Sequence, residues 1–361
     1  MNDLRVTSEQ FCADYIHTSV DKRFVLGTGE YARSISAAIE IAGFIDDYSD
    51  ASEIDGVQIL RTDQVPDQSL VVVASMLRPR SAMQTIKDRG LRALDYFAFE
   101  RYSGIKIKPV AFWSAFESDY NEHRGKYDQL RSRLHDQESR NLLDNLVRFR
   151  MQGDLEAMAD YDFDPIGQYF EDFLDLRLDG ETFVDVGSFD GQTSLEFAKR
   201  APEFARIIAF EPSDVNRPLV EKRLLELGAD RIMVYPYGLG AESTTMRFDS
   251  RAGSSSRASV TGDAEVSVVT LDSLEIPTAT FVKMDIEGGE VEALEGALST
   301  IARCRPRLAI SVYHRATDLW RIPETVDKAG VAYNLYLRHY TEGIDETVMF
   351  FIPQGPFLSF V

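Results

Sequence analysis

A strand that runs directly into a glycine-rich turn and then a helix organises the second half of this chain. The run Thr182 to Val186 is followed by the turn Gly187 to Gly191, a helical stretch to Lys199 and a new strand at Ile207 to Phe210. Strands and helices that alternate at this spacing predict a parallel sheet with helices packed on its faces.

The same alternation continues to the end of the chain. It predicts further strands at Ile232–Tyr235, Val266–Val269, Thr280–Asp285, Arg307–Tyr313, Tyr333–Leu337 and Thr347–Ile352, and helices near Val215–Leu227, Glu290–Ala302 and Leu319–Lys328. The Ser-rich stretch Ser250–Ser259 predicts a loop. We therefore predict a doubly wound α/β domain over residues 179–361.

The first hundred residues predict a second, smaller α/β domain. A strand at Arg23–Leu26 leads into Gly27-Thr28-Gly29-Glu30-Tyr31-Ala32, a helix to Ile41 and a strand through Gly43 to Asp47. We interpret residues 1–105 as a Rossmann-like domain. The residues that follow show no strand pattern. Leucines recur at helical spacing between Tyr127 and Met151, which predicts a helical connector over residues 106–178.

Length, charge and cysteine content narrow the classes of function. A chain of 361 residues favours two domains, and a net charge of -20 repels phosphate backbones, so we expect no nucleic-acid partner. Cys12 and Cys304 lack the spacing of a disulfide framework or a zinc site. We expect no signal peptide or transmembrane helix, a cytoplasmic location, and leave homo-oligomerisation open.

The glycine turn predicts a nucleoside site. Gly187 and Gly191 allow a ligand to approach the backbone, and the carboxyl ends of parallel strands are where such sheets bind ligands. Neither a G-x-G-x-x-G pattern nor a Walker lysine is present here, which favours a ligand without phosphate. Glu211 ends the next strand, where a carboxylate can accept both ribose hydroxyls. The alternative is ordinary turn chemistry. The predicted cofactor-binding residues are Asp185, Gly187, Ser188, Asp190, Gly191, Glu211 and Asp285.

Charged residues end the strand at Thr280–Asp285. Alternation places Lys283 and Asp285 on one face of that strand, and Glu287 follows in the turn. These groups are predicted to orient a substrate hydroxyl or to hold a divalent metal, which is left open. Alternatively, Glu287 and Glu290 only complement the dipole of the following helix.

His314 ends the next strand and is the predicted general base, because imidazole accepts a proton near neutral pH. Asp285 is the second catalytic candidate. The alternative is a histidine that Asp318 or a backbone carbonyl satisfies. Polar-tipped aromatic residues nearby, among them Tyr313 and His339, either line an acceptor pocket or belong to the core.

These residues resemble the FkbM family of S-adenosylmethionine-dependent O-methyltransferases. The resemblance lies in Val184–Gly191, Phe210-Glu211-Pro212 and Lys283–Gly288, with a tail similar to one branch of the family at Ser311–His314 and Leu337–Tyr340. It covers about half of the chain. It implies a seven-stranded sheet with its last strand antiparallel, S-adenosylmethionine as methyl donor, and transfer to a hydroxyl of a carbohydrate, glycan precursor or secondary metabolite. Nucleotide-linked and lipid-linked sugars are among the acceptors that it leaves open.

The first domain carries a weaker motif. Gly27, Gly29 and Asp46 fit a nucleotide site, and the segment resembles the nucleotide-sugar-binding domain that precedes some sugar acyltransferases. The alternative is a Rossmann-like domain used for packing or dimerisation. Two other functions stay open for the whole chain: an NAD-dependent oxidoreductase or epimerase, and a non-catalytic nucleotide-sensing scaffold. The missing Tyr-x-x-x-Lys pair argues against the short-chain form of the first.

Overall fold

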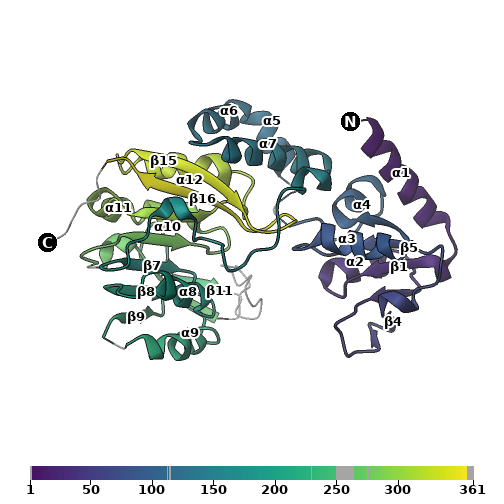
Figure 1. Ribbon diagram of the computed structural model, residues 1–361, viewed down its shortest axis with the longest axis horizontal. Coiled ribbons are helices and arrows are strands. Elements are labelled where there is room, and N and C mark those ends of the chain that lie inside the picture. The colour runs from purple at the N-terminus through teal and green to yellow at the C-terminus, as the bar shows by residue number, and fades with distance from the viewer. Residues whose placement is uncertain are drawn as a thin grey trace. The chain divides into compact units, whose positions relative to one another are not determined.

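The computed structural model describes residues 2–355 except 112, 114, 229, 249–263 and 275. The chain divides into two compact units, each built from separate stretches of sequence (Figure 1). Unit 1 comprises residues 1–121, 141–164 and 340–345, and unit 2 comprises 122–140, 165–339 and 346–361. The predicted Ser-rich loop at Ser250–Ser259 lies outside the described residues.

Unit 2 is built on a seven-stranded sheet in the order β15-β16-β14-β13-β7-β8-β9. The strands β7, β8, β9, β13 and β14 run parallel to one another, whereas β16 is antiparallel to both β14 and β15. Their bounds are Thr182–Val186, Arg206–Phe210, Ile232–Tyr235, Phe281–Met284 and Arg307–Ser311 for the parallel strands, and Tyr333–His339 and Thr347–Pro353 for β15 and β16. The predicted doubly wound sheet with an antiparallel last strand is confirmed.

Helices α8 (Gln192–Arg200) and α9 (Arg217–Leu224) pack against each other, and α12 (Asp318–Asp327) contacts both α10 (Glu290–Glu295) and α6 (Arg124–Arg133). Apolar side chains pack on this sheet and stabilise it. The ring of Phe183 on β7 stacks on the rings of Phe197 and Phe281, with centroid distances of 4.5 and 5.1 Å respectively.

Three predicted elements of unit 2 need correction. The helix predicted over Glu290–Ala302 is two helices, α10 and α11 (Leu298–Cys304), because the backbone at Gly296 lies so close to the carbonyl oxygen of Gly240 that a Cβ would sit 2.0 Å from it. The helix predicted over Val215–Leu227 starts later, at Arg217, and its last residues form a 3-10 turn. The strand predicted at Val266–Val269 belongs to a separate three-stranded sheet, β10 (Gly238–Leu239), β12 (Ala264–Val269) and β11 (Thr244–Phe248).

Unit 1 contains a six-stranded sheet in the order β3-β4-β2-β1-β5-β6, parallel except for the β3–β4 hairpin. Its elements are α1 (Asn2–His17), β1 (Arg23–Leu26), α2 (Glu30–Ala38), β2 (Gly43–Ile45), β3 (Glu53–Ile54), β4 (Val57–Leu60), β5 (Leu70–Val73), α3 (Pro79–Asp88), β6 (Arg92–Asp95) and α4 (Tyr96–Tyr102), followed by α5 (Phe116–Glu122) and α7 (Gln137–Gln152). β6 ends at Asp95, because the Asp95 carboxylate accepts the Ala98 N–H at 2.9 Å and starts α4.

The connection between β15 and β16 is part of unit 1. Its Glu342 carboxylate accepts the backbone N–H of Ser81 at 2.7 Å, near the start of α3. Its Gly343 packs so closely that a Cβ would lie 1.7 Å from the carbonyl oxygen of Met76. Within the residues that the structure describes, no helix is both long enough and apolar enough to cross a membrane.

Candidate active site

The glycine turn after β7 is pressed against the end of β13. Gly187 has a φ of +80°, and a Cβ there would lie 1.9 Å from the carbonyl oxygen of Asp285. Gly191 has a φ of +79° and precedes the first turn of α8. Only glycine combines this backbone conformation with so close an approach at position 187. The turn therefore brings the carboxyl ends of two neighbouring strands together.

A buried ion pair supports the glycine turn. Asp185 on β7 is fully buried, accepts the Ser194 hydroxyl at 2.7 Å and lies 3.3 Å from the Lys283 ammonium group. Lys283 in turn donates to the carbonyl oxygen of Gly187 at 2.6 Å. The predicted substrate residue Lys283 and the predicted cofactor residue Asp185 thus hold the turn, and neither is open to solvent in this structure.

Glu211 at the end of β8 holds the other side of the turn. Its two carboxylate oxygens accept the backbone N–H groups of Phe189 and Ser213 at 2.8 and 2.9 Å. Burial raises the pKa of Glu211, and these two N–H groups oppose the rise. The hydroxyl of Ser188 donates to the carbonyl oxygen of Asp185, and Asp190 accepts the Gln192 N–H at 3.0 Å. The predicted cofactor residues therefore converge on one turn.

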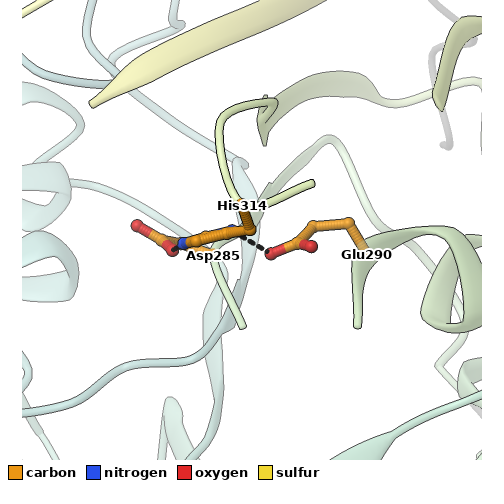
Figure 2. A group of neighbouring side chains, drawn as sticks. All are labelled: Asp285, Glu290 and His314. Carbon is orange, nitrogen blue, oxygen red and sulfur yellow. Dashed lines mark hydrogen bonds and ion pairs between the residues drawn. The ribbon is translucent and has the colours of Figure 1, made fainter. Parts of the chain in front are cut away.

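His314 lies between two carboxylates at the same edge of the sheet. Figure 2 shows Asp285 and Glu290 on opposite sides of its ring. Nδ1 is 2.9 Å from Glu290 Oε1, whereas Nε2 is 3.4 Å from Asp285 Oδ1 and 3.8 Å from Glu287 Oε2. Asp318, the alternative partner, instead accepts the Arg315 N–H at 2.7 Å.

The charges in this cluster shift the pKa values of its members. Burial disfavours the cationic form of His314, but the carboxylates of Glu290, Asp285 and Glu287 outweigh it and raise the His314 pKa to about 10. Burial also disfavours ionised Asp285, yet the charges of His314 and Lys283 lower its pKa below the ordinary value. Burial and the nearby Glu290 raise the pKa of Asp318 to about 7.

Sequence reasoning missed two parts of the site. The Tyr169 hydroxyl donates to Asp285 Oδ2 at 2.6 Å, although Tyr169 belongs to the stretch interpreted as a connector. Glu290 was interpreted only as a complement to the helix dipole, but it also accepts the Ile286 N–H at 2.9 Å and orients His314. The apolar pattern of a buried strand predicts neither the contact of Tyr169 with Asp285 nor that of Glu290 with His314. The Gly288-Gly289-Glu290 run ahead of a helix was the one available signal for Glu290.

The remaining predicted residues are spread more widely. Glu287 has a left-handed φ of +58° and stays close to His314. Tyr313 is buried beside the His314 ring, and His339 Nδ1 lies 2.9 Å from the Thr347 hydroxyl, with the side chain buried.

The predicted nucleotide residues Gly27, Gly29 and Asp46 belong to unit 1. There Asp46 accepts the Thr28 hydroxyl and the backbone N–H groups of Tyr48 and Ser49, so its carboxylate holds its own loop together.

A protein family and several solved structures are similar to this chain. The sequence of residues 185–342 matches the family described as Methyltransferase FkbM domain. The fold is similar to that of the methyltransferase FkbM from Methylobacillus flagellatus KT, with a TM-score of 0.72 and 23% identity over 97% of this chain and 98% of that one. An rRNA methylase from Streptococcus thermophilus covers 51% of this chain and 93% of its own, with 17% identity and a TM-score of 0.35. No curated protein matches the chain.

The family match coincides with the site. It begins at Asp185, below the glycine turn, and includes Glu211, Asp285, Glu290 and His314. The resemblance that the strand and turn motifs predict is thereby confirmed, because residues 185–342 of this chain match the FkbM methyltransferase family.

Proposed function

We propose that the chain is an S-adenosylmethionine-dependent O-methyltransferase whose donor lies along the turn Gly187–Gly191. The observation that carries this proposal is the position of Glu211, which ends β8 beside that turn and has both oxygens fixed by backbone N–H groups. A carboxylate so oriented retains lone pairs for the two ribose hydroxyls of a nucleoside.

The charge at this edge supports a cationic donor. Asp285 and Glu287 keep 18% and 16% of their side-chain surface exposed, whereas the imidazole of His314 is fully covered. Exposed carboxylates stabilise the positive sulfonium of S-adenosylmethionine by Coulomb attraction. The groups that meet the donor's reactive end are thus acidic.

Methyl transfer then requires alignment and one proton acceptor. The acceptor oxygen forms a bond to the methyl carbon as the carbon–sulfur bond breaks, which leaves S-adenosylhomocysteine and one proton. We propose that Asp285, whose carboxylate is partly exposed, accepts that proton with His314 beside it, because a histidine whose pKa is raised to about 10 already carries its proton at neutral pH. The proposed acceptor is a hydroxyl of a carbohydrate, a glycan precursor or a secondary metabolite.

Calorimetric titration of S-adenosylmethionine into the full chain and Glu211→Ala tests the donor site without an acceptor. Loss of two hydrogen bonds to a charged group, worth about 1.5 kcal/mol each, predicts affinity about 150-fold weaker. Glu221→Ala, which removes a carboxylate of α9 with a side chain 54% exposed, is the matched control. Equal affinity in wild type and Glu211→Ala, with matching thermal unfolding, would refute the assignment.

We further propose that unit 1 binds a nucleotide or a nucleotide-linked sugar at Gly27, Gly29 and Asp46. The support is the parallel sheet of unit 1 and the hydrogen bond between Thr28 and Asp46, which ties the ends of β1 and β2 together. A thermal-shift series with nucleotide sugars and dinucleotides tests it. No shift with any of them would remove this role and leave the donor site unaffected.

A further inference from the structure

Two carboxylate oxygens on the Nε2 side of His314 lie at separations close to those between the ligands of one metal ion. Nε2 lies 3.4 Å from Asp285 Oδ1 and 3.8 Å from Glu287 Oε2. Both separations exceed the about 2.7–3.2 Å of an N–H to oxygen hydrogen bond. Ligands bound about 2.0–2.2 Å from one divalent ion lie about 3–3.5 Å apart, and the two separations from Nε2 are close to that range.

The other ring nitrogen is held as metal-binding histidines usually are. Nδ1 faces Glu290 Oε1 at 2.9 Å, and that oxygen also accepts the Ile286 N–H. A carboxylate that receives the second ring N–H fixes the tautomer and the ring plane of a metal ligand. Because Glu290 holds Nδ1, Nε2 is the nitrogen that faces Asp285 (Figure 2), and Glu287 lies near the same nitrogen.

The cluster also carries more negative charge than its neighbours balance. Glu290 is 1% exposed, and its second oxygen, Oε2, has no hydrogen-bond partner among the residues that the structure describes. Nearby, Lys283 is paired with Asp185, and Tyr169 contributes a hydroxyl to Asp285 without a charge. Three carboxylates therefore surround a single imidazole, whose positive charge balances only one of them, and Glu290 is buried where unbalanced anionic charge is costly.

We infer that His314 Nε2, Asp285 Oδ1 and Glu287 Oε2 bind one divalent first-row transition-metal ion, with Glu290 as the outer carboxylate that orients His314. One imidazole with two carboxylates suits Mn²⁺, Fe²⁺, Co²⁺ or Zn²⁺ better than Ca²⁺, which prefers oxygen ligands alone. The exposed surfaces of Asp285 and Glu287 leave the remaining coordination positions open to water or a hydroxyl. Ion binding does not depend on the proposed function, whereas use of the ion to activate an acceptor hydroxyl rests on it.

Titration of CoCl2 and MnCl2 into the chelator-treated full chain, followed by calorimetry, tests the site without donor or acceptor. We expect one equivalent of ion per chain. Asp285→Asn retains the shape of the side chain but removes a charged ligand, and should weaken binding at least about 30-fold. Glu290→Gln should weaken it by about 10 to 100-fold, the usual effect of losing an outer carboxylate.

The matched control is Glu292→Gln, which changes a carboxylate of the same helix that is paired with Arg315. Its ion affinity should equal that of wild type. A second measurement locates the ion: Mn²⁺ should broaden the imidazole NMR signals of His314, and the chain has only five histidines to assign.

Two outcomes would overturn the site. One is the absence of stoichiometric binding of either ion to folded protein, and the other is equal affinity in wild type and Asp285→Asn. Failure of S-adenosylmethionine binding would contradict the proposed function and leave these titrations unaffected, so the two failures are distinguishable.

Discussion

Lys283 is a buried residue that holds the glycine turn in place. Its ammonium group is buried, pairs with the fully buried Asp185 and binds the Gly187 carbonyl. Lys283→Met removes the cation and leaves the Asp185 carboxylate uncompensated, which is expected to lower the free energy of unfolding by about 3–5 kcal/mol. Urea unfolding followed by circular dichroism measures this.

Lys199→Met is the control for this prediction, because Lys199 forms an exposed pair with Glu196 on α8. Such pairs contribute about 0–1 kcal/mol. A loss below about 1 kcal/mol in Lys283→Met would show that the buried pair does not support the turn. Replacing both partners, as in Lys283→Met with Asp185→Leu, should recover part of the loss.

Sequence predicted the placement of single residues where chain direction determines it. Asp285 and His314 follow adjacent parallel strands, so they had to meet at one edge, and they do. The burial of a side chain was not predictable in the same way. Alternation gives the face of a strand but not what covers it, so Asp185 was expected to face a ligand. The contact of Tyr169 with Asp285 was not predicted, because the two residues lie 116 positions apart in the sequence.

At the scale of elements, the cap of α4 makes stability depend on pH. Asp95 is buried and starts this helix by accepting the Ala98 N–H. Burial raises the pKa of Asp95 to about 6, above the unfolded value of about 3.8, although backbone N–H groups oppose the rise. The folded state therefore favours the protonated form. This contribution to stability is complete below about pH 4 and is lost as pH rises through about 6.

Asp95→Asn should remove that dependence and keep the cap, because asparagine also caps helices well. Two pKa units correspond to about 3 kcal/mol, so the stability of the variant relative to wild type should rise by about this amount between pH 4 and pH 7. Urea unfolding at pH 4, 5.5 and 7 measures the difference. Asp88→Asn, at an exposed carboxylate of α3, is the control, and an identical pH trend in Asp95→Asn and wild type would contradict the prediction.

The elements themselves were predictable from local pattern, and their ends were not. The core strands of unit 2 were found because buried parallel strands are continuous apolar runs. The split between α10 and α11 depends instead on a tertiary contact, the close approach of Gly296 to Gly240. The end of β6 depends on one side chain, Asp95, whose carboxylate starts α4.

At the scale of the whole molecule, the methyltransferase unit draws on sequence well before its first strand. Residues 122–140 and 165–178 belong to unit 2. The Tyr127 hydroxyl of α6 donates to the Ala316 carbonyl at 3.1 Å, and Asp136 lies 2.7 Å from Arg338 on β15. Composition and periodicity marked this region as a helical connector, and only long-range contacts show what it packs against.

A fragment of residues 179–361 should therefore be much less stable than one of residues 122–361. The shorter fragment lacks α6, which packs on α12, it lacks Asp136, which compensates the largely buried Arg338, and it lacks Tyr169 beside Asp285. Each kcal/mol of lost stability lowers the melting temperature of a domain of this size by about 2–4 °C, and these contacts together contribute several kcal/mol. We expect a melting temperature at least about 10 °C lower, or no cooperative transition, in thermal scans by circular dichroism. Equal transitions in both fragments would mean that residues 179–361 fold independently, as the domain boundary predicted from the sequence at residue 179 implies.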